Sequence, residues 1–450
     1  MASGAARSQL AAGERDAHAR SRTRLRGSPA RRPHALADWA NLTAGPAALI
    51  AALVLSGGDL AGYVRFRAVC AAWRACSDDP RAGVVFDRRF HPRRWIMLPP
   101  AFAVRGRRPF LDVTHADLLP SAAAAAPYPT ARDAPVARRC ESLANAAAAY
   151  VDRYNLNTPA GASPKRCLVD AHVRLPDPRR HRVLGATAEG LVVLCRKDTL
   201  AVQLLNPLTG QRADDLPPAT TLLKRRARVT GDLNELRLIG AGLAGGSTLA
   251  LHYGVSAIAV AKSGDPCWTL LRPPDHGWLT SAMPMASAGR FYCVTSEQTI
   301  IVVEAATASR PAQLAAAAAV DDDPDIASSC SDIVCLGDNN GELVCVLWTR
   351  RPTEPNGGKH AACRVDLGTG SMAPVRGFGG NALFMGMGRS VLAPPRISRS
   401  IAADTMYVCY DCNVSTGRPD VVAIDLLGRC SKPEVRMTDV AYFLASYVCS

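Results

Sequence analysis

The sequence lacks an apolar segment long enough to cross a membrane. Its longest unbroken apolar run, Pro46 to Leu55, is about ten residues, whereas a spanning helix needs roughly 20. No apolar stretch follows the first residues, so we do not expect a secretory signal. These absences predict a protein with no membrane partner. At 450 residues the chain exceeds one typical core, so we expect two or more structural units.

The sequence also lacks local signatures of catalysis. We find no HExxH, HxxxH, GxSxG or GxxxxGK[ST] pattern. The Cys409–Cys412 pair has no second Cys or His pair beside it, so buried structural thiols are favoured over a zinc or redox site. Gly386–Ser390 resembles half of a dinucleotide loop, but the third glycine is missing and we expect a strand or bulge there. We therefore predict no catalytic residue, no cofactor, no metal and no enzymatic activity.

Cysteine is plentiful, with 15 residues, but the cysteines are scattered inside apolar runs. Without a secretory signal, reduced buried thiols are favoured over a disulfide framework. A catalytic triad assembled from distant positions would escape this survey. A propeller hydrolase or oxidoreductase is therefore a competing hypothesis, and it would need acids, histidines or a metal converging on a central channel.

Acidic residues are scarce in the first 34 residues, where eight arginines face only Glu14 and Asp16 and supply much of the net charge of +14. Residues 1–37 are therefore predicted to be a disordered basic tail. A solvated tail is the favoured interpretation, with an organelle transit peptide and a nuclear-localisation patch as alternatives. We expect localisation in the nucleus, the cytoplasm or both, with organelle import less favoured.

A second basic cluster, Lys224–Arg228, would bind an acidic partner, serve nuclear import or remain a solvated loop, which is the commonest outcome. The triple aspartate 321–323 lacks the glycine and terminal glutamate of a calcium loop. The rest of the chain is only mildly basic, so we do not expect a nucleic-acid partner.

Two helices are predicted within residues 38–80. The first covers about Pro46 to Leu55, because proline is tolerated at a helix start. The second runs from Leu60 to about Ala75, with Asp59 as its N-cap. Its apolar face is predicted from an i, i+3, i+4, i+7 spacing, which is that of Phe66, Val69, Cys70 and Trp73. So short a unit cannot bury both apolar faces, so the rest of the chain or another protein must cover them.

Residues 81–108 are predicted to form a linker that docks the helical unit onto the next domain. The docking residues are apolar side chains among arginines: Phe90, Trp95, Ile96 and Met97. Low-complexity segments near 122–163 and 305–324 are read as insertions. No long helical period is found after about residue 150, so the fold class is α+β, with a predominantly β domain over 109–450.

Strand patterns recur through this second domain. Strands at about 190–195 and 200–205 flank a tight turn, and Asp338–Gly341 is a strong hairpin signal because Asn and Gly tolerate positive φ. The segments 204–218 and 365–375 both combine a strand, a glycine turn and a polar exit. Roughly 40 to 50 residues per four strands is the period of propeller blades, so we expect a β-propeller, with six blades favoured.

Residues 38–79 resemble an F-box. The resemblance rests on Asp59-Leu60, on Val64–Cys70 and on Trp73-Arg74, although Ala71 replaces the usual basic residue. The strand-rich remainder resembles the kelch-like region of plant F-box proteins, especially those of grasses. The matching segments are Arg89–Trp95, His181–Gly185, Leu204–Gly210 and Leu383–Ser390.

The resemblance implies a substrate-recognition subunit of an SCF-type cullin–RING ubiquitin ligase, in which the F-box binds a Skp-type adaptor and the propeller binds an unknown target. It implies these adaptor-contacting residues: Leu42, Leu49, Ile50, Leu53, Leu60, Val64, Val69, Cys70 and Trp73. The family usually opens with Leu-Pro, whereas here Thr43 follows Leu42 and proline appears only at 46. The alternative function is therefore a scaffold propeller outside any ligase, with a degenerate F-box.

Overall fold

The computed structural model describes residues 42–97, 107–113, 171–223, 236, 238–253, 257–273, 278–285, 289–319, 331–350, 358–413, 418–431 and 440–449. The predicted tail, the 122–163 insertion, the Lys224–Arg228 cluster and the triple aspartate lie outside these residues. The α-helices are α2 (Ala44–Ser56), α3 (Leu60–Val69), α4 (Ala71–Ala75) and α7 (Val440–Cys449). The short 3-10 helices are η2 (Arg88–Phe90), η5 (Ala219–Thr221) and η8 (Pro395–Ile397). Within the described part of the chain, no helix is long and apolar enough to cross a membrane.

The described strands form six sheets, most of them four-stranded, and their pairs are antiparallel except for one parallel pair. The first three contain β1 (Trp95–Met97), β2 (Arg107–Asp112) and β3 (Ala171–Arg174); β4 (His181–Ala186), β5 (Val192–Arg196), β6 (Val202–Leu205) and β7 (Arg212–Ala213); β8 (Leu238–Ala244), β9 (Thr248–Tyr253), β10 (Ala257–Ala261) and β11 (Thr269–Leu271). The last three contain β12 (Leu279–Met285), β13 (Arg290–Thr295), β14 (Thr299–Glu304) and β15 (Gln313–Ala319); β16 (Ser331–Asn339), β17 (Glu342–Arg350), β18 (Gly358–Val365) and β19 (Met372–Pro374); β20 (Ala382–Met385), β21 (Ser390–Ala393), β22 (Thr405–Asn413), β23 (Arg418–Asp425) and β24 (Cys430–Ser431).

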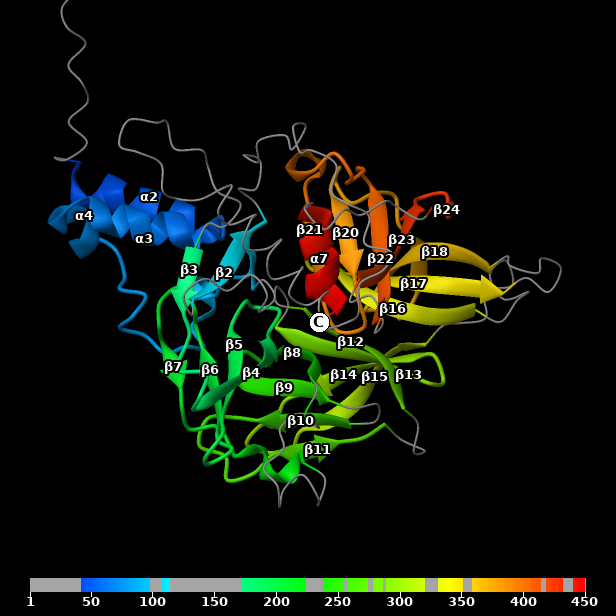
Figure 1. Ribbon diagram of the computed structural model, residues 1–450, viewed down its shortest axis with the longest axis horizontal. Helices are drawn as coiled ribbons and strands as arrows, with labels where there is room; N and C mark the ends of the chain where they lie inside the picture. The colour runs from blue at the N-terminus through cyan, green and yellow to red at the C-terminus, as the bar shows by residue number, and fades with distance from the viewer. Residues whose placement is uncertain are drawn as a thin grey trace, which may run out of the picture.

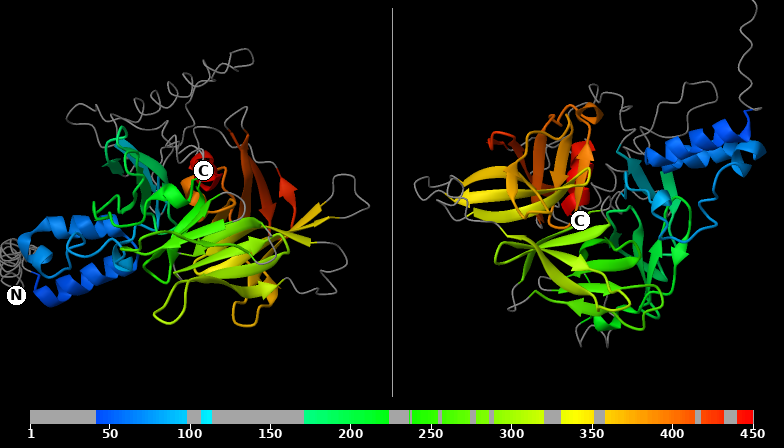
Figure 2. Two further views of the ribbon diagram at one scale, coloured as in Figure 1. Left: turned by 90° about the horizontal axis from the view of Figure 1, so that it is seen from below. Right: turned by 180° about the vertical axis from the view of Figure 1, so that it is seen from behind.

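Each sheet packs against the next through a separate cluster of buried apolar side chains. Val193 of β5 and Leu251 of β9, for example, share one cluster. The last sheet returns to the first, because Phe384 and Tyr407, stacked 4.5 Å apart, share a cluster with Leu111 of β2. The sheets therefore follow one another in a ring, with the helical unit projecting from its edge (Figure 1, Figure 2). This arrangement is consistent with the predicted propeller.

Predicted turns occur where the residue types require them. Asn340 and Gly341 have φ of 52° and 99° at the hairpin between β16 and β17, as the Asp338–Gly341 signal predicts. After β6, the Asn206 side chain accepts hydrogen bonds from two backbone amides, at 3.1 and 3.2 Å. After β18, Asp366 does the same, at 2.8 and 3.3 Å. The segments 204–218 and 365–375 therefore resemble each other because they contain the same kind of turn.

The segment Gly386–Arg389 is the turn of the β20–β21 hairpin, so a strand follows it rather than a helix. The Met387 carbonyl accepts hydrogen bonds from the Ala282 amide at 2.8 Å and from the Ser281 hydroxyl at 3.2 Å. A side chain at Gly388 would collide with the backbone of Ile239 in β8. The small residues here serve close packing of the turn against β8 and β12.

Two predictions about regular structure were wrong. The second helix does not run unbroken to Ala75, because Cys70 is extended (φ −155°, ψ 170°) and separates α3 from α4. The 305–324 segment is not a simple insertion, because its alanine run forms β15. The strand pairs along the length of β14, and Ala318 packs in the cluster shared with the next sheet, so tertiary pairing outweighs the helical preference of alanine.

Two further boundaries differ from expectation. The segment read as a linker over 81–108 contains β1, which pairs with β2 and so belongs to the first sheet. The apolar stretch near the end of the chain forms the ten-residue helix α7, although no long helical period was found after about residue 150. Its described side chains pack in the cluster shared by the first and last sheets. Four of them, Ala441, Leu444, Ala445 and Val448, follow an i, i+3, i+4, i+7 spacing, which was the available signal.

Candidate functional site

The helical unit is built on a capped turn between α2 and α3. Gly58 adopts φ +77°, a conformation that side chains disfavour, and this reverses the chain after α2. The Asp59 carboxylate then accepts a hydrogen bond from the Gly62 amide at 2.6 Å, which satisfies an otherwise free helix-end donor. The predicted N-cap of the second helix is therefore confirmed.

The two helices pack through a small core. Leu60, Tyr63 and Phe66 lie on one side of α3 and are buried. Ala47 and Ala51 are the buried residues of α2, and their small side chains let the helices approach closely. Sequence reasoning missed Tyr63, whose i, i+3, i+6 spacing with Leu60 and Phe66 was the available signal.

Trp73 reaches this core from α4. The ring of Trp73 stacks on Phe66, with centroids 4.6 Å apart and an interplanar angle of 21°. The extended residue Cys70 changes the direction of the chain between α3 and α4. Its sulfur accepts a hydrogen bond from the Trp73 amide at 3.4 Å. Trp73 is therefore half-buried, with one ring face packed on the helical unit itself.

The nine residues implied by the F-box resemblance divide into three groups. Leu60 is buried, at 1% exposed, and belongs to the core of the unit. Four are half-buried: Leu42, Ile50, Cys70 and Trp73. Four are exposed apolar side chains, which we call the outer apolar set: Leu49 (67%), Leu53 (70%), Val64 (38%) and Val69 (59%). Leu49, Leu53 and Val69 leave more than half of their surface free for a partner, and Val64 leaves about a third.

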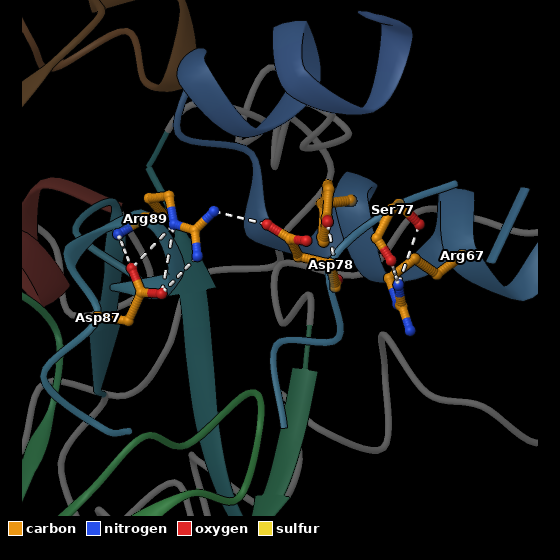
Figure 3. Close-up of polar contacts among 6 residues, drawn as sticks. Arg67, Ser77, Asp78, Asp87 and Arg89 are labelled. Carbon is orange, nitrogen blue, oxygen red and sulfur yellow. Dashed lines mark hydrogen bonds and ion pairs between the residues drawn. The ribbon is translucent and has the colours of Figure 1, made fainter. Parts of the chain in front are cut away.

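Polar contacts hold the segment after α4 against α3. The Arg67 guanidinium donates to the Ser77 hydroxyl at 3.0 Å and to the Ser77 carbonyl, and it lies 3.6 Å from the Asp79 carboxylate. The Tyr63 hydroxyl donates to the Asp78 carbonyl at 2.8 Å, and burial raises the pKa of Tyr63. Figure 3 shows Arg67 directed at Ser77. These contacts stabilise the helical unit that presents the outer apolar set.

Arg89 connects the helical unit to the segment that leads into the sheets. Its guanidinium lies 2.6 Å from Asp78 and 2.8 Å from Asp87 (Figure 3). Its hydrogen bonds lower the pKa of Asp87, so that carboxylate stays charged. All three groups are partly open to water, so the contribution to stability is small, although the geometry orients the segment.

The segment from Arg88 to Trp95 lies between the helices and the sheets. The Phe90 ring packs in the core of the helical unit, 5.9 Å from Tyr63, while its carbonyl accepts a hydrogen bond from Asn206 after β6 at 2.7 Å. Trp95 packs with strands of the first and second sheets. Ile96 packs between the first and last sheets, and Met97 lies half-buried beside Trp95.

An open cleft of about 510 Å³ lies between α2 and this segment. Its lining includes Arg88, His91 and Arg93, none of which was assigned a role from sequence. The signal available was the density of arginine around Phe90 and Trp95. A linker does not need so many arginines, so their number could have predicted a charged surface at this segment.

Apolar side chains are also exposed on the ring of sheets. Trp278, just before β12, is 58% exposed, and Met387, in the turn that contacts β12, is 44% exposed. Trp268, just before β11, is instead buried, and its indole N–H donates to the Pro217 carbonyl at 3.0 Å. Both tryptophans directly precede a strand, and only the packing around them separates the buried one from the exposed one.

Burial shifts the pKa of several cysteine and histidine side chains toward the neutral form. Burial raises the pKa of Cys195 and Cys335 to about 12, which disfavours the reactive thiolate. Burial lowers the pKa of His252 to about 4. Cys409 is buried, while the side chain of Cys412 is outside the described part. Among the described residues, no group of three or more His, Cys, Asp or Glu could hold a metal ion.

The ring of antiparallel sheets defines the class of this chain as a β-propeller protein preceded by a small helical unit. Residues 162–435 match the model of the KIB1-4 beta-propeller family. This match covers more than half of the chain, so the protein belongs to that family. No curated protein matches the chain.

Three solved structures illustrate how distant the structural similarities are. The β-propeller domain of Cps50 (Swd1) from Myceliophteria thermophila is 10% identical, with 58% of this chain and 84% of that chain covered and a TM-score of 0.23. A prolyl endopeptidase is 12% identical, with 54% and 46% covered and a TM-score of 0.20. Hsv2p of Kluyveromyces lactis is 10% identical, with 45% and 57% covered and a TM-score of 0.20. At these scores the similarities carry no functional argument.

Proposed function

We propose that this protein is a substrate receptor of an SCF-type cullin–RING ubiquitin ligase. In this proposal the helical unit is an F-box that binds a Skp-type adaptor, and the ring of sheets is a six-bladed propeller that binds the target. The protein contributes no catalytic group, and it acts by holding the target near the ligase, which raises the target's effective concentration.

The outer apolar set is the observation that carries this proposal. Leu49 and Leu53 are four residues apart on α2 and are exposed by 67% and 70%. Val64 and Val69 are exposed on α3. A unit this small, with four exposed apolar side chains at its surface, gains stability from a partner that covers them.

The arrangement of the chain supports a role as a receptor for another protein. Membership of a propeller family accounts for a domain with many loops on a rigid frame, which is the usual setting of a protein-binding surface. The exposed Trp278 is a candidate target contact, since exposed tryptophan is enriched at the centres of interfaces. A ligase receptor of this kind would work in the nucleus, the cytoplasm or both.

A scaffold outside any ligase is the second candidate. The observation that favours it is the start of α2, where Thr43 is the N-cap but makes no side-chain capping bond. Pro46 then falls at the third helical position, so the start differs from the Leu-Pro opening of ordinary F-boxes. In this candidate the adaptor contact has been lost while the propeller still binds a partner.

Co-purification with a Skp-type adaptor and a cullin separates the two candidates. The full chain is co-expressed with both, and an ordinary F-box protein serves as the positive control. We expect adaptor and cullin to be recovered in equal amounts with the chain. Recovery of neither protein, under conditions where the control recovers both, would leave only the scaffold.

A further inference from the structure

The outward side of α3 carries an arginine beside an exposed apolar side chain. The three buried residues of α3, which are Leu60, Tyr63 and Phe66, face the core of the helical unit. At about 100° per residue, Arg65 is on the opposite side of the helix and is exposed. Val69 is four residues further on, so it lies beside Arg65, and it is 59% exposed. This side of α3 therefore offers a partner a charged group next to an apolar one.

A second exposed arginine lies at the same end of the helical unit. The Arg74 Nε donates a hydrogen bond to the Arg67 carbonyl at 3.2 Å, which holds the Arg74 side chain at the last turn of α3. This bond uses one of the five N–H donors of the guanidinium. Within the described part of the chain, neither Arg65 nor Arg74 forms an ion pair.

The positive charge at this end is not balanced by nearby acids. α2 contains no charged residue, and α3 and α4 contain arginines but no acid. The two acids after α4 contact other arginines: Asp78 lies 2.6 Å from Arg89 (Figure 3), and Asp79 lies 3.6 Å from Arg67. Asp59 is at the opposite end of α3, where it serves as the N-cap. The charge that is left over belongs to the two exposed arginines described above and favours a negatively charged partner.

The ring of sheets does not cover these two arginines. Ala61, near the start of α3, packs in the cluster that contains Trp95 and strands of the first two sheets. From there α3 leads away from the ring toward α4 (Figure 1, Figure 2). The C-terminal end of α3 and α4 are therefore accessible to another protein.

We propose that Arg65 and Arg74 bind carboxylates of the protein that covers the outer apolar set, so that this partner presents acidic side chains beside its apolar contact. The inference rests on the proposed function, in which that protein is the Skp-type adaptor. A nucleic acid would satisfy the two guanidinium groups but leave the outer apolar set uncovered. A partner with a purely apolar surface would cover the guanidinium groups without a counter-charge, which is costly.

Isothermal titration calorimetry of the full chain with a purified Skp-type adaptor, at low and at high salt, tests this proposal. Arg65→Gln removes a side chain that makes no ion pair within the described part of the chain, and Arg65→Gln/Arg74→Gln removes both charges. We expect the double variant to raise Kd about tenfold at low salt, since exposed ion pairs contribute modestly. Raising the salt concentration should weaken the wild type more than the double variant. Arg65→Lys keeps the charge and should restore most of the affinity.

Arg310→Gln/Arg399→Gln is the matched control, because both arginines are exposed on the ring of sheets and the change removes the same total charge. It should leave Kd unchanged, and urea unfolding checks that each variant is folded. If the wild type binds the adaptor but the two double variants have equal effects, or Kd does not change with salt, the proposal is overturned while the ligase function stands. It is also overturned if Arg65→Lys binds as weakly as Arg65→Gln. If the wild type does not bind the adaptor, both proposals fail.

Discussion

The outer apolar set predicts which leucines of α2 act in adaptor binding and which positions act in folding. The informative change is the double substitution Leu49→Ala/Leu53→Ala. Both side chains are mostly exposed, at 67% and 70%, so the folded chain loses little packing. Alanine is also a better helix former than leucine. We expect the free energy of unfolding to stay within ~0.5 kcal/mol of the wild type.

The expected loss of binding follows from the exposed fractions. Full burial of a leucine side chain is worth ~2 kcal/mol, so covering about two thirds of each contributes ~1.4 kcal/mol. The pair then contributes ~3 kcal/mol, which corresponds to a ~100-fold rise in Kd. Isothermal titration calorimetry with a purified Skp-type adaptor measures this change, and urea unfolding of the same samples measures stability.

Two comparison variants make the result interpretable. Leu427→Ala removes the same atoms from a leucine that is 78% exposed in the turn between β23 and β24, and it should change neither quantity. Leu60→Ala removes a leucine that is 1% exposed, and it should cost ~2–5 kcal/mol of stability. If the wild type binds the adaptor and the double variant binds within threefold of it, the outer apolar set is not the contact surface. If the wild type does not bind, the ligase proposal fails first.

Three further predictions concern stability. Gly190→Ala should destabilise the chain more than Gly210→Ala: both glycines have positive φ, but only at Gly190 would the new methyl group collide with the Pro92 backbone. Thermal unfolding should show the order, and equal effects would count against close docking of this segment. Asp59→Ala should lower the stability of the helical unit by ~1 kcal/mol through loss of its N-cap, measured by hydrogen exchange of α3; unchanged protection would mean that the cap is dispensable. Burial lowers the pKa of His252 to about 4, so between pH 4 and 6.5 the unfolded state binds more protons than the folded state, and stability falls as the pH falls. His252→Leu should reduce the dependence of the urea midpoint on pH over this range. An unchanged dependence would mean that His252 does not cause it.

Local signals in the sequence were sufficient to predict the capped turn before α3 and many of the strands. Asp59 was predictable as a cap because a short carboxylate reaches amides within the same turn. The β5–β6 and β16–β17 hairpins were predictable because short apolar runs flank a recognisable turn. Each of these features depends on residues close together in the chain.

The predictions of secondary structure were wrong where contacts between distant parts of the chain determine the conformation. The alanine run of β15 has a helical preference, and it becomes a strand because β14 offers an unpaired edge. The short apolar run of α7 could not be told from a buried strand by its sequence, and it is a helix that packs against the first and last sheets. The break at Cys70 depends on Trp73 returning to stack on Phe66. In each case the deciding partner lies outside the local segment.

The candidate site shows the same division. The sequence by itself determined that a short helical unit with excess apolar surface precedes a strand-rich domain, because periodicity records how much apolar surface a segment carries. Only the tertiary structure decided that Leu60 is core while Leu49 and Leu53 are exposed, and that Arg88 and His91 border a cleft. Periodicity places side chains on a face, whereas burial depends on which other parts of the chain pack against that face.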